Sequence, residues 1–389
     1  HLQFPKIEGA QTQIARGFIR IAKPGRYSFT SAGESQCKVD GKVVYDRLTG
    51  KAPVSKVVRY ELGTYPIEIT FDGGGSTFLA YRFLDSPGLL HTLVKEQGKY
   101  PHLLNDQGEW ASRDDVWYKG VVTATANKWL SVGCGSGDGK IGPELGFGWV
   151  TGDHHDEPVL ILKASQGNRS LSWDFLPPGS ESVEHTDSDG KTWVYAGYKE
   201  SPNRWVKGTE PEAIGWYAGK QYDDCFNEAR EVLANFDKNF PMWEGRGYEI
   251  AGFGWWQGHK DGGQNGSDQA ELPALRYEHN LVNLINSLRK EFEAPNAPFV
   301  IATCGFEGGE GWQSGSSADT IFKAQMNVSD PAEHPKFAGN VKSVDTRPFY
   351  RPPEASPKNQ GFHYHQNAET YYLVGEAMGK AMVELLSKQ

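Results

Sequence analysis

The chain of 389 residues lacks two features that would point to particular partners. No apolar run approaches the roughly 18 residues needed to cross a bilayer, so we expect no membrane span. Basic residues are not in excess either: 40 lysines and arginines stand against 49 acidic residues, for a formal net charge of −9. Binding to phosphates needs a basic face, so this charge balance argues against a nucleic-acid partner. With 38% hydrophobic and 23% charged residues, the composition is that of an ordinary globular protein.

Cysteine is also scarce. The chain has four cysteines, which are widely spaced and form no CxxC pair: Cys37, Cys134, Cys225 and Cys304. Such spacing does not fit a metal cluster. Up to two disulfides in an oxidising compartment and four buried thiols both fit the sequence. No HxxxH or HExxH spacing occurs among the histidines, so neither a metal site nor a cofactor is predicted.

The aromatic content and the first residue bear on the ligand and the location. Twelve tryptophans, 17 tyrosines and 46 glycines fit sugar-stacking surfaces with tight loops, and equally fit large aromatic cores with turns. The chain begins at His1, without an initiator methionine or a signal peptide. A mature chain left after signal removal has this form. We therefore expect a secreted or cell-surface protein, at the bacterial exterior or in the periplasm.

Residues 1–87 read as an all-β domain. Short β-branched or alternating runs are separated by turn signals, and Asp40-Gly41 between two such runs predicts a two-residue hairpin. The order Pro24-Gly-x-Tyr-x-Phe, Val39-Asp-Gly-Lys-x-Val and Leu62-Gly-x-Tyr-Pro-Ile-x-Ile resembles the protective-antigen-type β-sandwich module over about residues 15–84. That module is often a sugar-binding appendage. The resemblance implies a β-sandwich with a possible role in glycan binding or assembly.

Residues 88–389 read as an α/β domain. Buried-strand runs at 159–163, 248–256, 299–303 and 340–344 alternate with helical patterns. One predicted helix spans 278–293, where leucine, isoleucine and phenylalanine recur at three- and four-residue spacing, and another ends the chain. Near-continuous apolar strands that alternate with helices predict a parallel sheet covered on both faces. In such sheets the chemistry lies in loops beyond the carboxyl ends of the strands.

Four loops carry candidate functional residues. Lys163–Trp173 directly follows a predicted strand and contains Gly167, where a backbone N–H can approach a substrate oxygen. Trp255–Asp261 follows another strand and holds a glutamine, a histidine and an aspartate. Gly142–Gly148 reads as the start of a helix. The fourth loop holds His363 and His365 just before the last helix, where an α/β hydrolase presents its general base.

Four blocks in these loops resemble, in order, the sialate O-acetylesterase-like branch of the SGNH hydrolases. They are Ile141-Gly-Pro-Glu-Leu-Gly-Phe-Gly-Trp, Glu157-Pro-Val-Leu-Ile-Leu-Lys-Ala-Ser-Gln-Gly-Asn-Arg-Ser-Leu, Gly254-Trp-Trp-Gln-Gly-His-Lys-Asp and His363-Tyr-His-Gln-Asn-Ala-Glu-Thr-Tyr. The resemblance runs from about residue 88 to the C-terminus. It implies a three-layer SGNH-hydrolase-like domain that removes acetyl groups from sugars with a serine nucleophile and a histidine base.

The resemblance also implies roles for single residues. Gly167 and Asn168 match the block that donates hydrogen bonds to the oxyanion. The next block is matched by Gln257, Gly258 and His259. His363 occupies the position of the histidine base, and His365 is a close rival for it.

The nucleophile block of the family is missing. No Gly-Asp-Ser or Gly-Gln-Ser-Asn precedes residue 88, and Ser35 is followed by a predicted hairpin instead of a helix. We therefore expect Ser35 to lie in a turn of the all-β domain. Ser165 and Ser170 are further candidates, although a serine in such a loop also caps the next element. The aspartate that orients the histidine is absent three residues before His363 and His365, which leaves Asp345 and Glu369 as substitutes.

Three functions therefore stay open. In the first, the protein has lost its serine block and serves at the cell exterior in glycan binding or structural self-assembly, as a homo-oligomer or a surface assembly. In the second, it is an active carbohydrate O-acetylesterase acting on an acetylated polysaccharide. In the third, the serine-bearing strand lies on another chain or on a piece removed by processing. We predict that no serine hydroxyl hydrogen-bonds His363 or His365.

Overall fold

The structure is a computed structural model that describes residues 2–4, 12–31, 34–48, 54–72, 77–123, 125–135, 140–262, 271–305, 308 and 311–388. The chain divides into two compact units, residues 1–100 and 101–389. Separate hydrophobic clusters lie inside each unit. Within the described residues, no helix combines the length and the apolar character that a membrane crossing requires.

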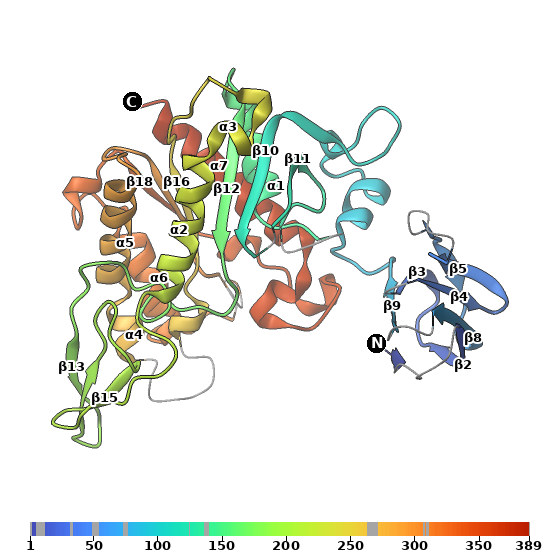
Figure 1. The fold of residues 1–389 in the computed structure, drawn as a ribbon, viewed down its shortest axis with the longest axis horizontal. Helices are drawn as coiled ribbons and strands as arrows, with labels where there is room; N and C mark the ends of the chain where they lie inside the picture. Colours follow the sequence, from blue (N-terminus) through green and yellow to red (C-terminus); the bar gives the residue numbers. More distant parts are fainter. Residues whose placement is uncertain are drawn as a thin grey trace. The chain divides into compact units, whose positions relative to one another are not determined.

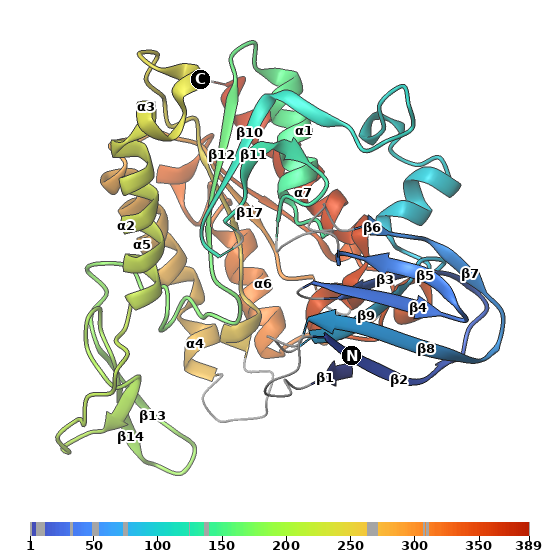
Figure 2. The ribbon, with the colours of Figure 1, turned by 45° about the vertical axis from the view of Figure 1, so that its right-hand side comes forward.

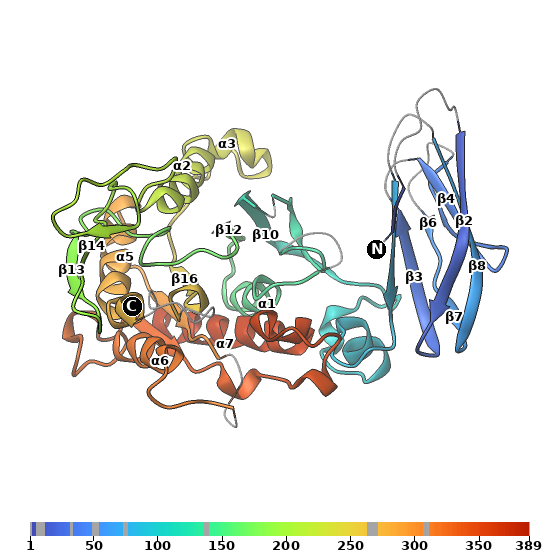
Figure 3. The same cartoon turned by 90° about the horizontal axis from the view of Figure 1, so that it is seen from below.

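The first unit is built from two antiparallel sheets, which Figure 3 shows nearly edge-on. The four-stranded sheet has the order β1 (Leu2–Phe4), β9 (Thr77–Phe83), β3 (Gly25–Ser31), β7 (Val58–Tyr60). The five-stranded sheet has the order β2 (Thr12–Ile21), β8 (Gly63–Asp72), β4 (Ser35–Val39), β5 (Lys42–Asp46), β6 (Val54–Ser55).

One hydrophobic cluster joins the two sheets. Phe29 and Leu79 contribute to it from the four-stranded sheet, and Cys37 and Ile69 contribute from the five-stranded sheet. Along β3 burial alternates from residue to residue, because successive side chains of a strand point to opposite faces. The short alternating runs of the sequence are therefore the strands that enclose this core.

The ends of this unit follow from local sequence. Asp40 and Gly41 link β4 to β5 with φ of 52° and 71°, which confirms the predicted two-residue hairpin. The unit continues past residue 87 to Tyr100. Thr92 opens the π-helix η1 (Thr92–Glu96) and donates to the carbonyls of Leu84 and Ser86, at 3.3 Å each. These bonds tie residues 88–100 to the all-β part of the chain.

The second unit contains three separate three-stranded sheets (Figure 1). The first has the order β11 (Asn127–Ser131), β10 (Ser112–Val122), β12 (Val159–Ser165), and β10 and β12 run parallel. The second is wholly parallel, with the order β16 (Phe253–Trp256), β17 (Phe299–Ala302), β18 (Val341–Val344). The third is an antiparallel excursion, β13 (Val183–Thr186), β14 (Thr192–Tyr195), β15 (Arg204–Val206).

Helices separate and cover these strands. The α-helices are α1 (Glu144–His154), α2 (Lys220–Ala234), α3 (Phe236–Asn239), α4 (Glu271–Leu275), α5 (Tyr277–Glu291), α6 (Ser317–Asn327) and α7 (Ala368–Leu386). The 3₁₀ helices are η2 (Pro101–Leu103), η3 (Pro241–Trp243), η4 (His259–Gly262), η5 (Pro335–Phe337), η6 (Arg347–Phe349), η7 (Pro353–Ala355) and η8 (Gly361–Gln366). The predictions of a helix over 278–293 and of a helix at the end of the chain are confirmed by α5 and α7.

The helices lie on both sides of the strands. Phe299 and Ile301 of β17 pack in a cluster with α5 and α6, whereas Val300 and Ala302 pack against α7. On β12, Leu160 and Leu162 pack in the cluster that holds α2. Figure 2 shows α2 and α5 on one side of the strands and α1 and α7 on the other. Apolar strands without alternation are therefore explained by cover on both faces.

The strands do not form one continuous ladder. The sequence predicts a single parallel sheet, whereas no described strand joins β12 to β16. The two strands nevertheless contribute to one environment, because Ala164 of β12 and Trp255 of β16 pack against the same cluster. Within the described residues, β12 pairs only with β10 and β16 pairs only with β17, so each strand is paired along one edge.

All four cysteines are described, and each is a free, buried thiol. Burial raises the pKa of the Cys37 thiol to about 12 and that of the Cys225 thiol to about 11. Of the two alternatives that the sequence left open, disulfides or buried thiols, the structure therefore favours buried thiols.

Candidate functional site

The loops after β12 and β16 are joined by one buried carboxylate. Asp261 accepts hydrogen bonds from the backbone N–H groups of Leu171 and Ser172, at 2.8 Å each. The side-chain amide of Gln257 donates to Asp261 at 2.7 Å and to the Arg169 carbonyl at 3.0 Å. Burial raises the pKa of Asp261, and these donated bonds oppose the rise. Two of the predicted loops therefore meet at the carboxyl ends of their strands.

Gln257 itself is held by buried side chains. The Tyr277 hydroxyl of α5 donates to the Gln257 carbonyl at 2.8 Å and lies 3.0 Å from its side-chain oxygen. Gln325 of α6 donates to the same carbonyl at 2.6 Å and accepts from the Cys304 N–H at 3.0 Å. The side chain predicted to bind substrate is thus largely engaged in positioning the loop.

Gly258 is required where it stands. Its φ is 155°, and a Cβ there would lie 2.8 Å from the Cys304 sulfur and 3.0 Å from Ile321. A larger residue would push the β16 loop away from β17 and α6. The third candidate block is therefore shaped by close packing.

The loop that carries the two histidines is anchored by its central tyrosine. Tyr364, His365 and Gln366 have φ of 46°, 55° and 58°, three consecutive left-handed residues without a glycine. The buried Tyr364 hydroxyl accepts from the Gly305 N–H at 3.1 Å, just beyond β17, and its ring lies 5.5 Å from that of Trp256. Asn367 then caps α7 by accepting from the N–H groups of Glu369 and Thr370.

His365 is buried and fully engaged. Its side chain is 4% exposed. Nδ1 accepts from the Gln360 N–H at 2.9 Å, and Nε2 lies 2.9 Å from the Tyr350 hydroxyl. Both ring nitrogens therefore have partners that hold the loop in place. This arrangement is typical of a structural histidine.

His363 lies in a different environment. It is exposed, and its ring lies 4.6 Å from the Phe362 ring, which in turn lies 6.5 Å from the His259 ring. No hydrogen bond joins its ring to another residue of the described chain. Although the residue is exposed, partial desolvation of its ring and the positive charges of Lys140 and Lys358 lower the pKa of His363, which favours the neutral form of the ring. Of the two candidates, His363 has the ring that a ligand can reach.

The candidate serines belong to elements other than the histidine loop. Ser35 is 0% exposed and is the first residue of β4 in the first unit, so it lies in a strand and not in the turn that the sequence predicts. Ser165 ends β12, and its carbonyl accepts from Thr123 at 2.5 Å. The Ser170 hydroxyl donates to Asp174 at 3.1 Å. In the part of the chain that the structure describes, no serine hydroxyl is hydrogen-bonded to His363 or His365.

The two substitute acids are paired with arginines. Asp345 forms an ion pair with Arg347 at 2.7 Å, and Glu369 forms one with Arg351 at 2.8 Å. Sequence reasoning missed an ion pair between the half-buried Lys163 of β12 and the buried Glu144, the first residue of α1. A glutamate that opens a helix is an ordinary N-terminal signal, so nothing in the sequence set this one apart.

The candidate oxyanion residues stand at an exposed turn. Gly167 and Asn168 are exposed, and Asn168 has φ of 57°. Their backbone N–H groups donate to no acceptor among the described residues, so they are available to a ligand oxygen. The described residues also contain no group of three or more histidine, cysteine or acidic side chains that could hold a metal ion.

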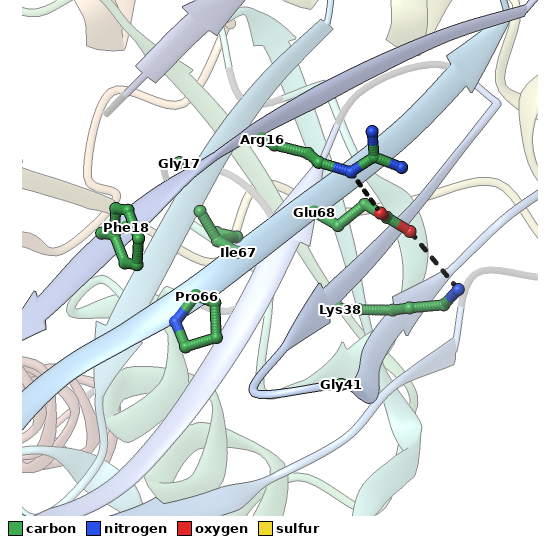
Figure 4. A pocket seen from close by; sticks show the side chains of 8 residues that line it. All are labelled: Arg16, Gly17, Phe18, Lys38, Gly41, Pro66, Ile67 and Glu68. Atoms are coloured by element: carbon green, nitrogen blue, oxygen red, sulfur yellow. Dashed lines mark hydrogen bonds and ion pairs between the residues drawn. The ribbon is translucent and has the colours of Figure 1, made fainter.

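A second candidate surface lies in the first unit. A pocket of about 470 Å³ lies on β2 and β8 and around the β4–β5 turn. Figure 4 shows the residues that line it: Arg16, Gly17, Phe18, Lys38, Gly41, Pro66, Ile67 and Glu68. Glu68 contacts Arg16 at 2.8 Å and Lys38 at 3.5 Å. Phe18 is 74% exposed. The pocket therefore pairs an exposed aromatic ring with a row of charges.

Comparisons with known proteins complete this description. No protein-family model matches the chain, and neither does any curated protein. Among solved structures, a carbohydrate acetylesterase from Xanthomonas citri is similar with a TM-score of 0.43 and 12% identity, over 100% of this chain and 76% of that one. A protein from Arabidopsis thaliana has a TM-score of 0.41 and 14% identity, over 71% of this chain and 87% of that one. A family two carbohydrate esterase from Clostridium thermocellum, in complex with cellohexaose, has a TM-score of 0.29 and 11% identity, over 95% of this chain and 90% of that one.

Proposed function

We propose that the chain is a carbohydrate-binding protein on a hydrolase-type scaffold and that its own residues do not form a complete hydrolytic pair. The observation that carries this proposal is the environment of the two histidines. His365 is held by Gln360 and Tyr350, at 2.9 Å each, and His363 has no serine partner among the described residues. A serine hydrolase needs a hydroxyl within hydrogen-bond reach of its base.

Three features at the site support a sugar ligand. Phe362 is 48% exposed and lies between the rings of His259 and His363, where a sugar ring can stack. The free N–H groups of Gly167 and Asn168 can donate to a sugar or acetyl oxygen. The neutral ring of His363 can donate or accept a further bond.

The finer assignments belong to the same proposal. The order of the four sequence blocks supports descent from the sialate O-acetylesterase-like branch of the SGNH hydrolases. The two antiparallel sheets of the first unit, with their shared core, support a protective-antigen-like sandwich for that unit. A role outside the cell follows from a polysaccharide ligand. Four free thiols neither require nor oppose that location.

The test is calorimetric titration of the full chain with acetylated xylan and with cellohexaose. Loss of the stacking ring in Phe362→Ala should weaken binding by about 3- to 10-fold, since an aromatic contact contributes about 0.5–1.5 kcal/mol. Phe18→Ala is the matched control, because it removes another exposed phenylalanine ring, from the other unit. If Phe18→Ala weakens binding and Phe362→Ala does not, the glycan site lies on the first unit instead.

An active carbohydrate O-acetylesterase is the second candidate. The exposed and neutral ring of His363 favours it, because such a ring can act as a general base. The same protein should be assayed with a chromogenic acetyl ester. We expect no hydrolysis above that of a His363→Ala variant. Turnover that His363→Ala abolishes would establish the esterase and reject the non-hydrolytic proposal.

A further inference from the structure

The second unit has two open strand edges in its interior layer. β12 pairs with β10 along all seven of its residues, and its other edge has no partner strand in the described part of the chain. β16 pairs with β17 along its four residues and is likewise open on its other edge. Within the described residues, no hydrogen-bonded ladder joins these two edges to each other. β17 separates β16 from β18, and β10 separates β12 from β11; Figure 1 labels β16 and β12 within the second unit.

Burial differs sharply between these strands and the strand that has two neighbours. β17 lies between β16 and β18, and all four of its residues are 0% exposed. The residues of β12 are all half-buried, although four of the seven are valine, leucine or isoleucine. Gly254 of β16 is exposed, and its neighbours in that strand are half-buried. Apolar parallel strands are normally covered on every side, so these two strands lack a neighbour.

The two strands nevertheless belong to one layer. Ala164 of β12 and Trp255 of β16 pack against one hydrophobic cluster. Beyond their carboxyl ends the loops are joined by Asp261, which accepts from Leu171 and Ser172, and by the bond from Gln257 to Arg169. An open edge on each side of a shared layer leaves two rows of N–H and C=O groups without strand partners. Only another extended backbone satisfies both rows at once.

We propose that the open edges of β12 and β16 together bind one extended, apolar polypeptide strand supplied in trans. The strand would run parallel to both neighbours, because the loops that follow β12 and β16 meet at Asp261, which brings the carboxyl ends of the two strands to the same edge. It would continue both ladders and cover the half-exposed side chains of β12. Its carboxyl end would emerge between the loop of Gly167 and Asn168 and the loop of Gln257 and His259. This binding is independent of the glycan-binding proposal, because it uses backbone edges and not Phe362.

Hydrogen–deuterium exchange of the full chain, read by mass spectrometry, tests the open edges first. Amides of residues 159–165 and 253–256 should exchange markedly faster than those of 299–302, because a strand amide without a partner is not protected. Equal, slow exchange in all three strands would overturn the proposal, since it would mean that the edges are already paired.

The second step adds a probe strand. The probe is a synthetic peptide with the sequence Pro298–Thr303 flanked by lysines, because β17 is the described strand that pairs in parallel on both edges. Saturating peptide should slow exchange at 159–165 and 253–256 by about 10-fold or more and leave 341–344 unchanged. A peptide of the same sequence with N-methylated amides is the matched control, because it keeps the side chains and loses the hydrogen bonds.

The outcomes separate the possible occupants. Protection by the probe and not by its N-methylated form supports a strand supplied in trans. Equal protection by both peptides would show that side chains alone bind and would overturn strand addition. Protection that appears without peptide and grows with protein concentration, together with a dimer in sedimentation velocity, would assign the edges to a second copy of this chain and overturn the proposal. Absence of protection with either peptide would also reject it.

Discussion

At the scale of single residues, two neighbouring histidines have opposite roles. The His365 ring holds the loop together through Gln360 and Tyr350, whereas the His363 ring faces outward beside Phe362. A structural side chain and one that a ligand can reach are therefore only two residues apart in the sequence. The left-handed backbone at Tyr364 and His365 produces this reversal, because it turns consecutive side chains to different sides.

Replacement of His365 by alanine should destabilise the protein by about 1–3 kcal/mol, because it removes the acceptor of the Gln360 N–H and the hydrogen bond to the Tyr350 hydroxyl. His363→Ala is the matched variant and should change stability by no more than about 0.5 kcal/mol, as is usual for an exposed side chain. Urea unfolding followed by tryptophan fluorescence measures both. Equal losses in the two variants would contradict the division of roles between these histidines.

At the scale of elements, α1 and α7 approach each other through glycines. A Cβ at Gly375 would overlap the carbonyl oxygen of Pro143, which caps α1, and a Cβ at Gly146 would overlap the carbonyl of Tyr372. At Gly379 it would lie 2.8 Å from Val150. The two helices are thus in backbone contact along one face. α7 in turn packs on β17, so this contact positions the start of the helix that follows the histidine loop.

Gly375→Ala should therefore force the helices apart and cost about 1–3 kcal/mol or more, although alanine is the better helix former. Lys380→Ala, at an exposed position of the same helix, controls for propensity and should change stability little. The midpoint of urea unfolding reports both changes. A Gly375→Ala variant as stable as the parent would show that the helices can separate at no cost.

Helices are the elements that the sequence predicts best. The three- and four-residue spacing of Leu281, Leu284, Ile285 and Leu288 predicts α5, because only a helix places these side chains on one buried face. Periodicity says nothing of which strands pair, so the open edges of β12 and β16 could not be predicted. The sequence of β2 gives no simple alternation either, since its exposed face carries the apolar Ile14 and Phe18 beside Arg16.

For the candidate site too, the sequence does not predict contacts between distant residues. The loops after β12 and β16 were each predicted to follow a strand, beyond its carboxyl end, and the contacts of Asp261 bring their residues together. The burial of His365 was not predictable, since it depends on a loop conformation that Tyr364 sets through the distant Gly305. Local sequence cannot report a contact between residues 59 positions apart.

At the scale of the whole molecule, the chain contains cores that do not share residues. The cluster around Phe29 belongs to residues 1–100, and the clusters around Ile301 and Val300 belong to residues 101–389. A core of its own is what allows a unit to unfold by itself. We therefore expect two unfolding events in one chain.

Scanning calorimetry should resolve two transitions, and core variants should move them separately. Phe29→Ala should lower only the transition of the first unit, and Ile301→Ala only that of the second, since each removes about 2–5 kcal/mol of local packing. The pair serves as reciprocal controls. A single transition that both variants lower to the same extent would show instead that the two units unfold as one.

The four buried thiols have a practical consequence for spectroscopy. Burial raises the pKa of the Cys304 thiol to about 12, as it does for Cys37, and thiolate is the form that reacts with maleimides. A single cysteine placed on the surface, for example at Lys380, would be the one site on the native protein that takes up a fluorophore quickly. The native cysteines should therefore react little with the label, and they need not be removed before site-specific labelling.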